Sequence, residues 1–181
     1  MVISMDTLLV DRNQAIIWRG PKKTGAIRQF IGETAWGELD FLIIDSPPGT
    51  GDEHLSILQM IPDALCLVVT SPAELALADV RKAINFLHTL KANILGVIEN
   101  MSALVCPHCG GKIEFYGGAD SGRELARSHK LAFLGSIPMD PIVSKFAEKG
   151  IPAVLMPVPS AAKSAYFALA ENVKNATIGR H

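Results

Sequence analysis

Long apolar runs are missing from this sequence of 181 residues. No stretch approaches the roughly 20 apolar residues that a membrane-spanning helix needs, so we expect no membrane partner. The N-terminus has no basic region ahead of an apolar stretch, which argues against a signal peptide. A net charge of −1 gives no basic excess, and we expect no nucleic-acid partner either.

Cysteine is also scarce, because the chain has only three, too few for a disulfide framework in a chain of this size. Two of them, Cys106 and Cys109, have the spacing C-x-x-C. In a reducing compartment this spacing indicates metal or redox chemistry, and we expect a cytoplasmic protein. Apolar residues make up 49% of the chain and charged residues 19%, which predicts a globular domain rather than disorder.

Short apolar runs alternate with helical periodicity along the chain. Buried strands are predicted at residues 41–44, 64–69, 94–98 and 131–134. Helices are predicted from Pro21, over residues 74–91, after the capping Asp140, and after the capping Ser160. The alternation predicts an α/β fold with a parallel sheet and helices on both faces. Residues 102–122, rich in glycine and cysteine, are predicted to form an insertion.

The most informative segment is D-S-P-P-G-T-G-D at residues 45–52, directly after the first predicted strand. An acid at the carboxyl edge of a parallel sheet, here Asp45, can hold Mg²⁺. Pro48 stiffens the following loop, and Gly49 and Gly51 let backbone N–H groups approach a phosphate. Asp52 could orient water or cap the next helix. The simpler interpretation is a strand, a turn and a capped helix.

The complete string resembles the switch II segment of Mrp-type iron–sulfur cluster carrier ATPases, a P-loop family of the MinD/ParA kind. Further matching segments follow in family order, so that the resemblance covers about residues 2–173. These segments are residues 17–21, 36–40, 70–74, 97–102, 106–109 and 135–138.

The resemblance implies a P-loop NTPase-like domain over residues 1–175 with a tail at 176–181. It implies ATP and Mg²⁺ as ligands, Asp45 and Asp52 as catalytic residues, and cofactor binding by Pro48, Gly49 and Gly51. However, no G-x-x-x-x-G-K-[ST] loop occurs in the sequence, since Gly20 and Gly25 have the right spacing but Ala26 follows. We therefore expect the first strand and the phosphate loop of the family to be absent, which leaves ATP hydrolysis by this chain open.

Asn100 follows the third predicted strand, and Pro138 lies in the segment after the fourth. An asparagine amide donates and accepts hydrogen bonds in one plane, as the edge of a purine requires. In MinD-like ATPases an asparagine at this position contacts adenine, so the resemblance implies that Asn100 and the backbone near Pro138 bind the base. Asparagine is also common in turns, which is the alternative.

Cys106 and Cys109 offer two thiolates, whereas a closed zinc site or a cubane cluster needs four ligands. Cys66 lies in a predicted strand and is expected to be a core residue, and His108 lies between the two cysteines. The resemblance implies a homodimer that shares one iron–sulfur cluster, expected to be 4Fe-4S, and passes it to acceptor apo-proteins. A Cys₄ zinc site and a redox dithiol remain alternatives.

Three functions are therefore open. The first is an ATP-dependent cluster carrier. The second is a ParA/MinD-like regulator, a class that lacks the C-x-x-C motif. The third is a dimeric metal-binding remnant without ATPase activity, because the phosphate loop is not found.

Overall fold

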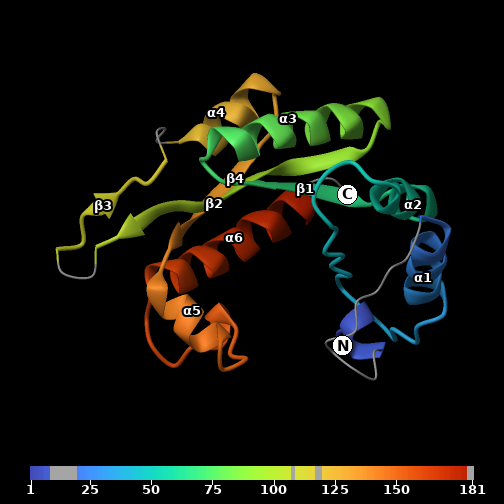
Figure 1. Cartoon of the computed structure of the whole chain (residues 1–181), viewed down its shortest axis with the longest axis horizontal. Helices are drawn as coiled ribbons and strands as arrows, with labels where there is room; N and C mark the ends of the chain where they lie inside the picture. Colours follow the sequence, from blue (N-terminus) through green and yellow to red (C-terminus); the bar gives the residue numbers. More distant parts are fainter. Residues whose placement is uncertain (9–19, 107–108, 117–119, 179–181) are drawn as a thin grey trace. The chain divides into compact units, whose positions relative to one another are not determined.

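The computed structural model describes residues 1–8, 20–106, 109–116 and 120–178 (Figure 1). The chain forms two compact units, Met1–Ala64 and Leu65–His181, each described here by itself. The first unit contains the 3-10 helix η1 (Met5–Leu8), α1 (Gly20–Gly32) and α2 (Asp52–Met60). The second contains β1 (Leu65–Thr70), α3 (Glu74–Thr89), β2 (Asn93–Val105), β3 (Lys112–Ile113), α4 (Ser121–Ser128), β4 (Phe133–Met139), α5 (Pro141–Ala147), η2 (Ala153–Leu155) and α6 (Ala161–Ile178). The extent of the predicted single domain stays a prediction.

The second unit is built on a sheet with β2 at its centre. β1 and β4 pair with β2 in parallel on its two sides, and the short β3 pairs with its end in antiparallel orientation. Helices α3 and α4 cover one face of this sheet, and α6 covers the other (Figure 1). The predicted α/β fold with a mainly parallel sheet and helices on both faces is confirmed.

The core between the sheet and α6 is formed by an apolar stripe of α6, which has helical spacing over residues 162, 165, 166, 169 and 173. Ala162 of α6 is buried with four aliphatic residues of β2 and β4, and Leu169 and Val173 pack against this cluster. Both predicted caps are present, since Asp140 Oδ1 accepts the Ile142 N–H at 3.1 Å and Ser160 Oγ accepts the N–H of residue 163 at 2.9 Å. Among the described residues, no helix is both long and apolar enough to cross a membrane.

Gly96 allows β2 and β4 to approach closely. A Cβ atom at this position would lie 2.6 Å from the Ala132 carbonyl oxygen and 2.8 Å from Leu134 Cγ. The same carbonyl accepts the Val97 N–H at 2.8 Å. A larger residue at position 96 would therefore separate the strands at the start of their ladder.

The prediction of a buried strand at residues 41–44 is wrong. These residues form no strand, and Phe41 and Ile43 are 51% and 77% exposed. In the described part of the first unit no strand is present to pair with them, and an apolar run without a neighbouring backbone cannot build a ladder. β1 also differs from the expectation of burial on both faces, because Leu67 and Val69 are exposed and β2 is its only described neighbour.

The other predicted strands are present with different ends. β2 continues to Val105, and β4 is shifted toward the C-terminus, so that Pro138 lies inside it. Proline is tolerated there because β4 is an edge strand of the described sheet, where part of the backbone needs no ladder partner. The predicted insertion at 102–122 contains the end of β2, β3 and the start of α4, a helix that the sequence pattern did not predict.

Candidate functional site

The C-x-x-C cysteines lie at the turn of a β-hairpin that extends beyond the layers of helices (Figure 1). Cys106 follows β2 directly, and Cys109 precedes β3. The Cys106 N–H donates to the Gly111 carbonyl at 2.8 Å, and the Gly110 N–H donates to the Cys106 carbonyl at 2.9 Å. Gly110 has φ +70°, a conformation that favours glycine. Backbone hydrogen bonds therefore join Cys106 to the described residues Gly110 and Gly111 on the other side of the turn.

Neither thiol of this turn forms a disulfide with a cysteine of the chain. Cys106 is half-buried, and Cys109 is exposed. His108, which lies between them, is outside the described residues. Among the residues that the structure describes, no group of three or more His, Cys, Asp or Glu side chains could hold a metal ion. The described part of one chain thus supplies two thiol ligands at this place and no more.

Cys66 has a different environment from the other two cysteines. It lies in β1 and is half-buried, and this burial raises the pKa of its thiol. A raised pKa keeps the thiol protonated, whereas the thiolate is the form that binds metals. This environment is typical of a small core residue, as the sequence predicted.

Asn100 and Pro138 lie near each other on the neighbouring strands β2 and β4. The β1–β2 ladder ends at the pair Thr70 and Glu99, and Asn100 is aligned with Ile137 of β4. The prediction that Asn100 follows the end of its strand is therefore wrong for β2 itself. It holds for the parallel ladder with β1, which ends one residue earlier.

The Asn100 side chain has its donor group available. Its Oδ1 accepts the Met101 N–H at 2.9 Å, and Met101 has φ +56°. Among the described residues, none accepts a hydrogen bond from Asn100 Nδ2. The amide oxygen thus fixes the side chain on its own backbone, while the amide nitrogen can donate to a ligand at the carboxyl ends of the parallel strands.

The segment from Asp45 to Asp52 belongs to the first unit, where it forms an exposed loop that leads into α2. Gly49 has φ +97°, which requires glycine at this turn. Gly51 is extended and precedes α2, and Asp52 lies in the first helical turn, where a carboxylate interacts favourably with the helix dipole. Asp45 is exposed and, because residues 41–44 are not a strand, lies at no sheet edge within this unit.

Helices α1 and α2 are joined by two polar contacts. Thr24 Oγ1 lies 3.1 Å from Ser56 Oγ, and Lys23 Nζ donates to Glu53 Oε1 at 2.7 Å, which lowers the pKa of Glu53. Gly20 and Gly25 both lie within helix α1, so this glycine pair does not form a phosphate loop.

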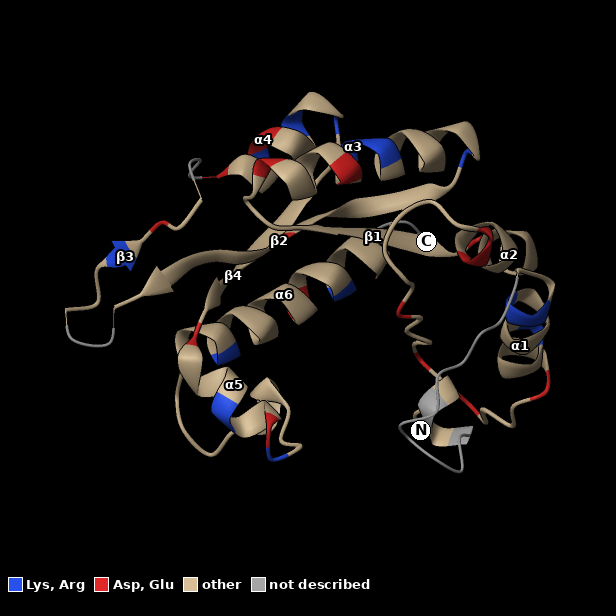
Figure 2. Ribbon diagram, viewed as in Figure 1, with Lys and Arg blue, Asp and Glu red and all other residues tan. Residues whose placement is uncertain are grey.

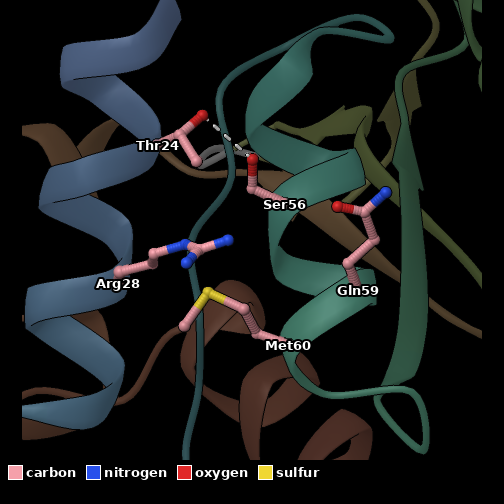
Figure 3. A pocket seen from close by; sticks show the side chains of 5 residues that line it. All are labelled: Thr24, Arg28, Ser56, Gln59 and Met60. Atoms are coloured by element: carbon pink, nitrogen blue, oxygen red, sulfur yellow. Dashed lines mark hydrogen bonds between the residues drawn. The ribbon is translucent and has the colours of Figure 1, made fainter.

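A small cavity lies between the same two helices (Figure 3). It is lined by Thr24, Arg28, Ser56, Gln59 and Met60. Its volume of about 80 Å³ is well below the roughly 300 Å³ at which pockets begin to hold small molecules. A nucleotide does not fit this cavity.

Comparison with known proteins identifies relatives over nearly the whole chain. The family described as "ParA: NUBPL iron-transfer P-loop NTPase" matches residues 1–174. An iron-sulfur cluster carrier protein of Pyrococcus horikoshii is 45% identical over 174 residues, which cover 96% of this chain and 58% of the relative. The cytosolic Fe-S cluster assembly factor CFD1 of Saccharomyces cerevisiae is 49% identical over 151 residues, with 81% and 50% covered. The chain thus spans little more than half the length of these relatives.

Solved structures with similar folds bind nucleotides. A nucleotide-binding protein from Archaeoglobus fulgidus, solved in complex with ADP, has a TM-score of 0.64 at 40% identity, over 76% of this chain and 56% of that one. The septum site-determining protein MinD of Pyrococcus horikoshii, in complex with Mg-ADP, has a TM-score of 0.61 at 25% identity, over 90% and 62%.

Proposed function

Because the chain belongs to the ParA-group family of NUBPL iron-transfer P-loop NTPases, we propose that it binds an iron–sulfur cluster and delivers it to acceptor proteins. The observation that carries this proposal is the pair of thiols, Cys106 and Cys109, on the turn of the protruding hairpin. A cluster held at such a turn would be accessible to a second protein. The names of the archaeal and yeast relatives, a cluster carrier and a cluster assembly factor, support the same function.

The cluster is shared by two copies of the chain. A four-iron cubane takes four cysteine ligands, and the hairpin offers two. Two hairpins that meet at their turns supply Cys106 and Cys109 twice. Because ligands from both copies are tied to one cluster, binding of the cluster and association of the chains strengthen each other. The same four thiolates could also bind one zinc ion. The experiments below must therefore distinguish a zinc site from an iron–sulfur cluster.

A nucleotide belongs to the same proposal. We assign adenine recognition to Asn100 Nδ2, with the backbone at Pro138 on the neighbouring strand beside the base. Asp45 would hold Mg²⁺ through water, and Asp52 would orient the attacking water. Pro48, Gly49 and Gly51 would shape the loop next to the phosphates. The nucleotide complexes of the Archaeoglobus fulgidus protein and of MinD support this assignment.

The proposed site of action is the cytosol, as the name of the yeast relative states for that protein.

Transfer of a cluster tests the function directly. The chain is loaded anaerobically with iron and sulfide, separated from free iron, and mixed with an apo-enzyme that regains activity when it receives a four-iron cluster. We expect recovery of activity even when an iron chelator is present, because the cluster moves between thiolates without release. Recovery that the chelator abolishes, or that chain loaded with zinc gives equally, would contradict a carrier function.

A further inference from the structure

The buried Glu99 is an unusual residue in the apolar centre of β2. Its exposed fraction is 3%, and it follows five consecutive buried positions in the strand. Its Oε2 accepts the Gly122 N–H at 2.6 Å. Burial of a carboxyl group is costly unless the group is hydrogen-bonded, so this contact explains how position 99 tolerates it.

Gly122 is suited to this contact because it lacks a side chain. A Cβ atom at position 122 would lie 2.8 Å from Glu99 Cβ and 3.0 Å from Glu99 Oε2. Gly122 is itself buried in the first turn of α4. The two residues therefore form a close contact between the end of the β1–β2 ladder and the start of α4.

This hydrogen bond joins the two ends of the segment that carries Cys106 and Cys109. The segment from residue 100 to residue 121 begins where β2 loses its pairing with β1, contains the last residues of β2 and all of β3, and ends at the start of α4. Within it, Met101 has φ +56°, and the pairing with β4 shifts register between Asn100 and Leu104. The strand is therefore irregular just beyond Glu99.

The helix at the other end of the segment is firmly attached to the unit. The Arg123 guanidinium lies 4.5 Å from the centre of the Phe133 ring, and Leu125 and Ala126 are 3% and 1% exposed. Because α4 is fixed in this way, a hydrogen bond from its first turn to Glu99 holds the base of the hairpin in one place. Loss of that bond would remove the hydrogen bond that joins β2 to the first turn of α4 at this point.

We propose that Glu99 is a positioning residue for the two hairpin thiols: through Gly122 it fixes the base of the segment 100–121, so that Cys106 and Cys109 are presented in one arrangement before a metal binds. This inference rests on the proposed function for its metal-binding consequence. The fixed base is a property of the metal-free chain and can be tested without any metal.

The first test is hydrogen exchange on the metal-free chain. Glu99→Ala removes the acceptor, and a lost hydrogen bond to a carboxylate should speed exchange of the amides between residues 100 and 122 by at least about tenfold. Glu99→Gln keeps an acceptor oxygen and should restore most of the protection. Glu124→Ala is the matched control, because Glu124 lies on the same helix but is exposed and binds only Arg127. Figure 2 shows acidic and basic residues on both α3 and α4, and the exposed pair of Glu124 and Arg127 lies on α4.

The second test is binding of Co²⁺, whose thiolate absorption reports ligation by Cys106 and Cys109. Glu99→Ala should weaken Co²⁺ binding about 10-fold, the lower end of the effect of residues that orient metal ligands. Glu99→Gln and Glu124→Ala should bind as the unchanged chain does. Gly122→Ala keeps the Glu99 side chain but forces it to move, so it should weaken Co²⁺ binding as Glu99→Ala does. If Glu99→Ala does not fold, Gly122→Ala takes its place in the test.

Each outcome decides a different point. Three results would overturn the proposal that the Glu99–Gly122 hydrogen bond holds the two ends of the segment together. They are unchanged exchange in Glu99→Ala, an equal effect of Glu124→Ala, and a Gly122 amide that exchanges freely in the unchanged chain. Faster exchange with unchanged Co²⁺ affinity would overturn the positioning role. An unchanged chain without any thiolate absorption would overturn the proposed metal function together with the role of Glu99 in it, while the exchange data would still decide the fixed base.

Discussion

Replacement of single cysteines should separate the hairpin thiols from the thiol in β1. The unchanged chain, loaded anaerobically with iron and sulfide, should hold about two irons per chain, because each chain contributes two of the four thiolates of a cubane. Cys106→Ser or Cys109→Ser leaves only two thiolates in a pair of chains, so the iron content should fall to nearly zero. Cys66→Ser should retain the full iron content.

The structure gives the reason for this difference. Cys106 and Cys109 lie three residues apart between β2 and β3, whereas Cys66 lies alone in β1, where burial raises the pKa of its thiol. Cys66→Ser places a hydroxyl in a partly buried position, which should cost about 1 kcal/mol of unfolding free energy. Iron and acid-labile sulfide are measured with the visible absorption of the cluster, and thermal unfolding of the metal-free variants provides the control. Full loss of iron in Cys66→Ser, or full retention in Cys109→Ser, would refute the reasoning.

Three further predictions concern the nucleotide and the core. The 181-residue chain should release no phosphate from Mg-ATP above background, since it contains no phosphate-loop motif; turnover that Asp45→Asn abolishes would contradict this. Asn100→Ala should weaken the binding of ATP roughly threefold to tenfold, the range of one hydrogen bond, and leave the binding of inorganic triphosphate unchanged; equal losses in calorimetry would indicate a structural role instead. Ile84→Ala, at a position that is 0% exposed in α3, should lower the unfolding free energy by about 2–5 kcal/mol. Leu75→Ala, at an 80% exposed position of the same helix, should leave it nearly unchanged, as denaturant titration can show.

The elements that the sequence predicted well depend on local signals. The stripe of α6 has helical spacing, and the caps Asp140 and Ser160 lie directly before the helices they cap. The strand predicted at residues 41–44 is absent because strand formation depends on a distant partner. An apolar run indicates burial but does not identify the strand that must pair with it. The length of β2 was missed because its end pairs with β3, a partner of two residues.

In the candidate sites, too, local features could be predicted from the sequence, whereas contacts between distant residues could not. The spacing of Cys106 and Cys109 is visible in the sequence, and the hairpin that presents them fits the predicted insertion. Glu99 was missed, since a single acid within an apolar strand has no pattern of its own. Its partner Gly122 is 23 positions away, and only the folded chain shows that the two residues meet.

The central claim, a cluster held between two copies of the chain, is tested most directly by mass and metal content on one sample. Sedimentation of the anaerobically reconstituted chain, with iron and sulfide measured on the same fractions, should give a dimer with about four irons per two chains. Removal of the cluster should shift the chain toward the monomer. A stable monomer that carries a complete four-iron cluster would contradict the claim, because one chain would then have to supply four ligands where its hairpin offers two.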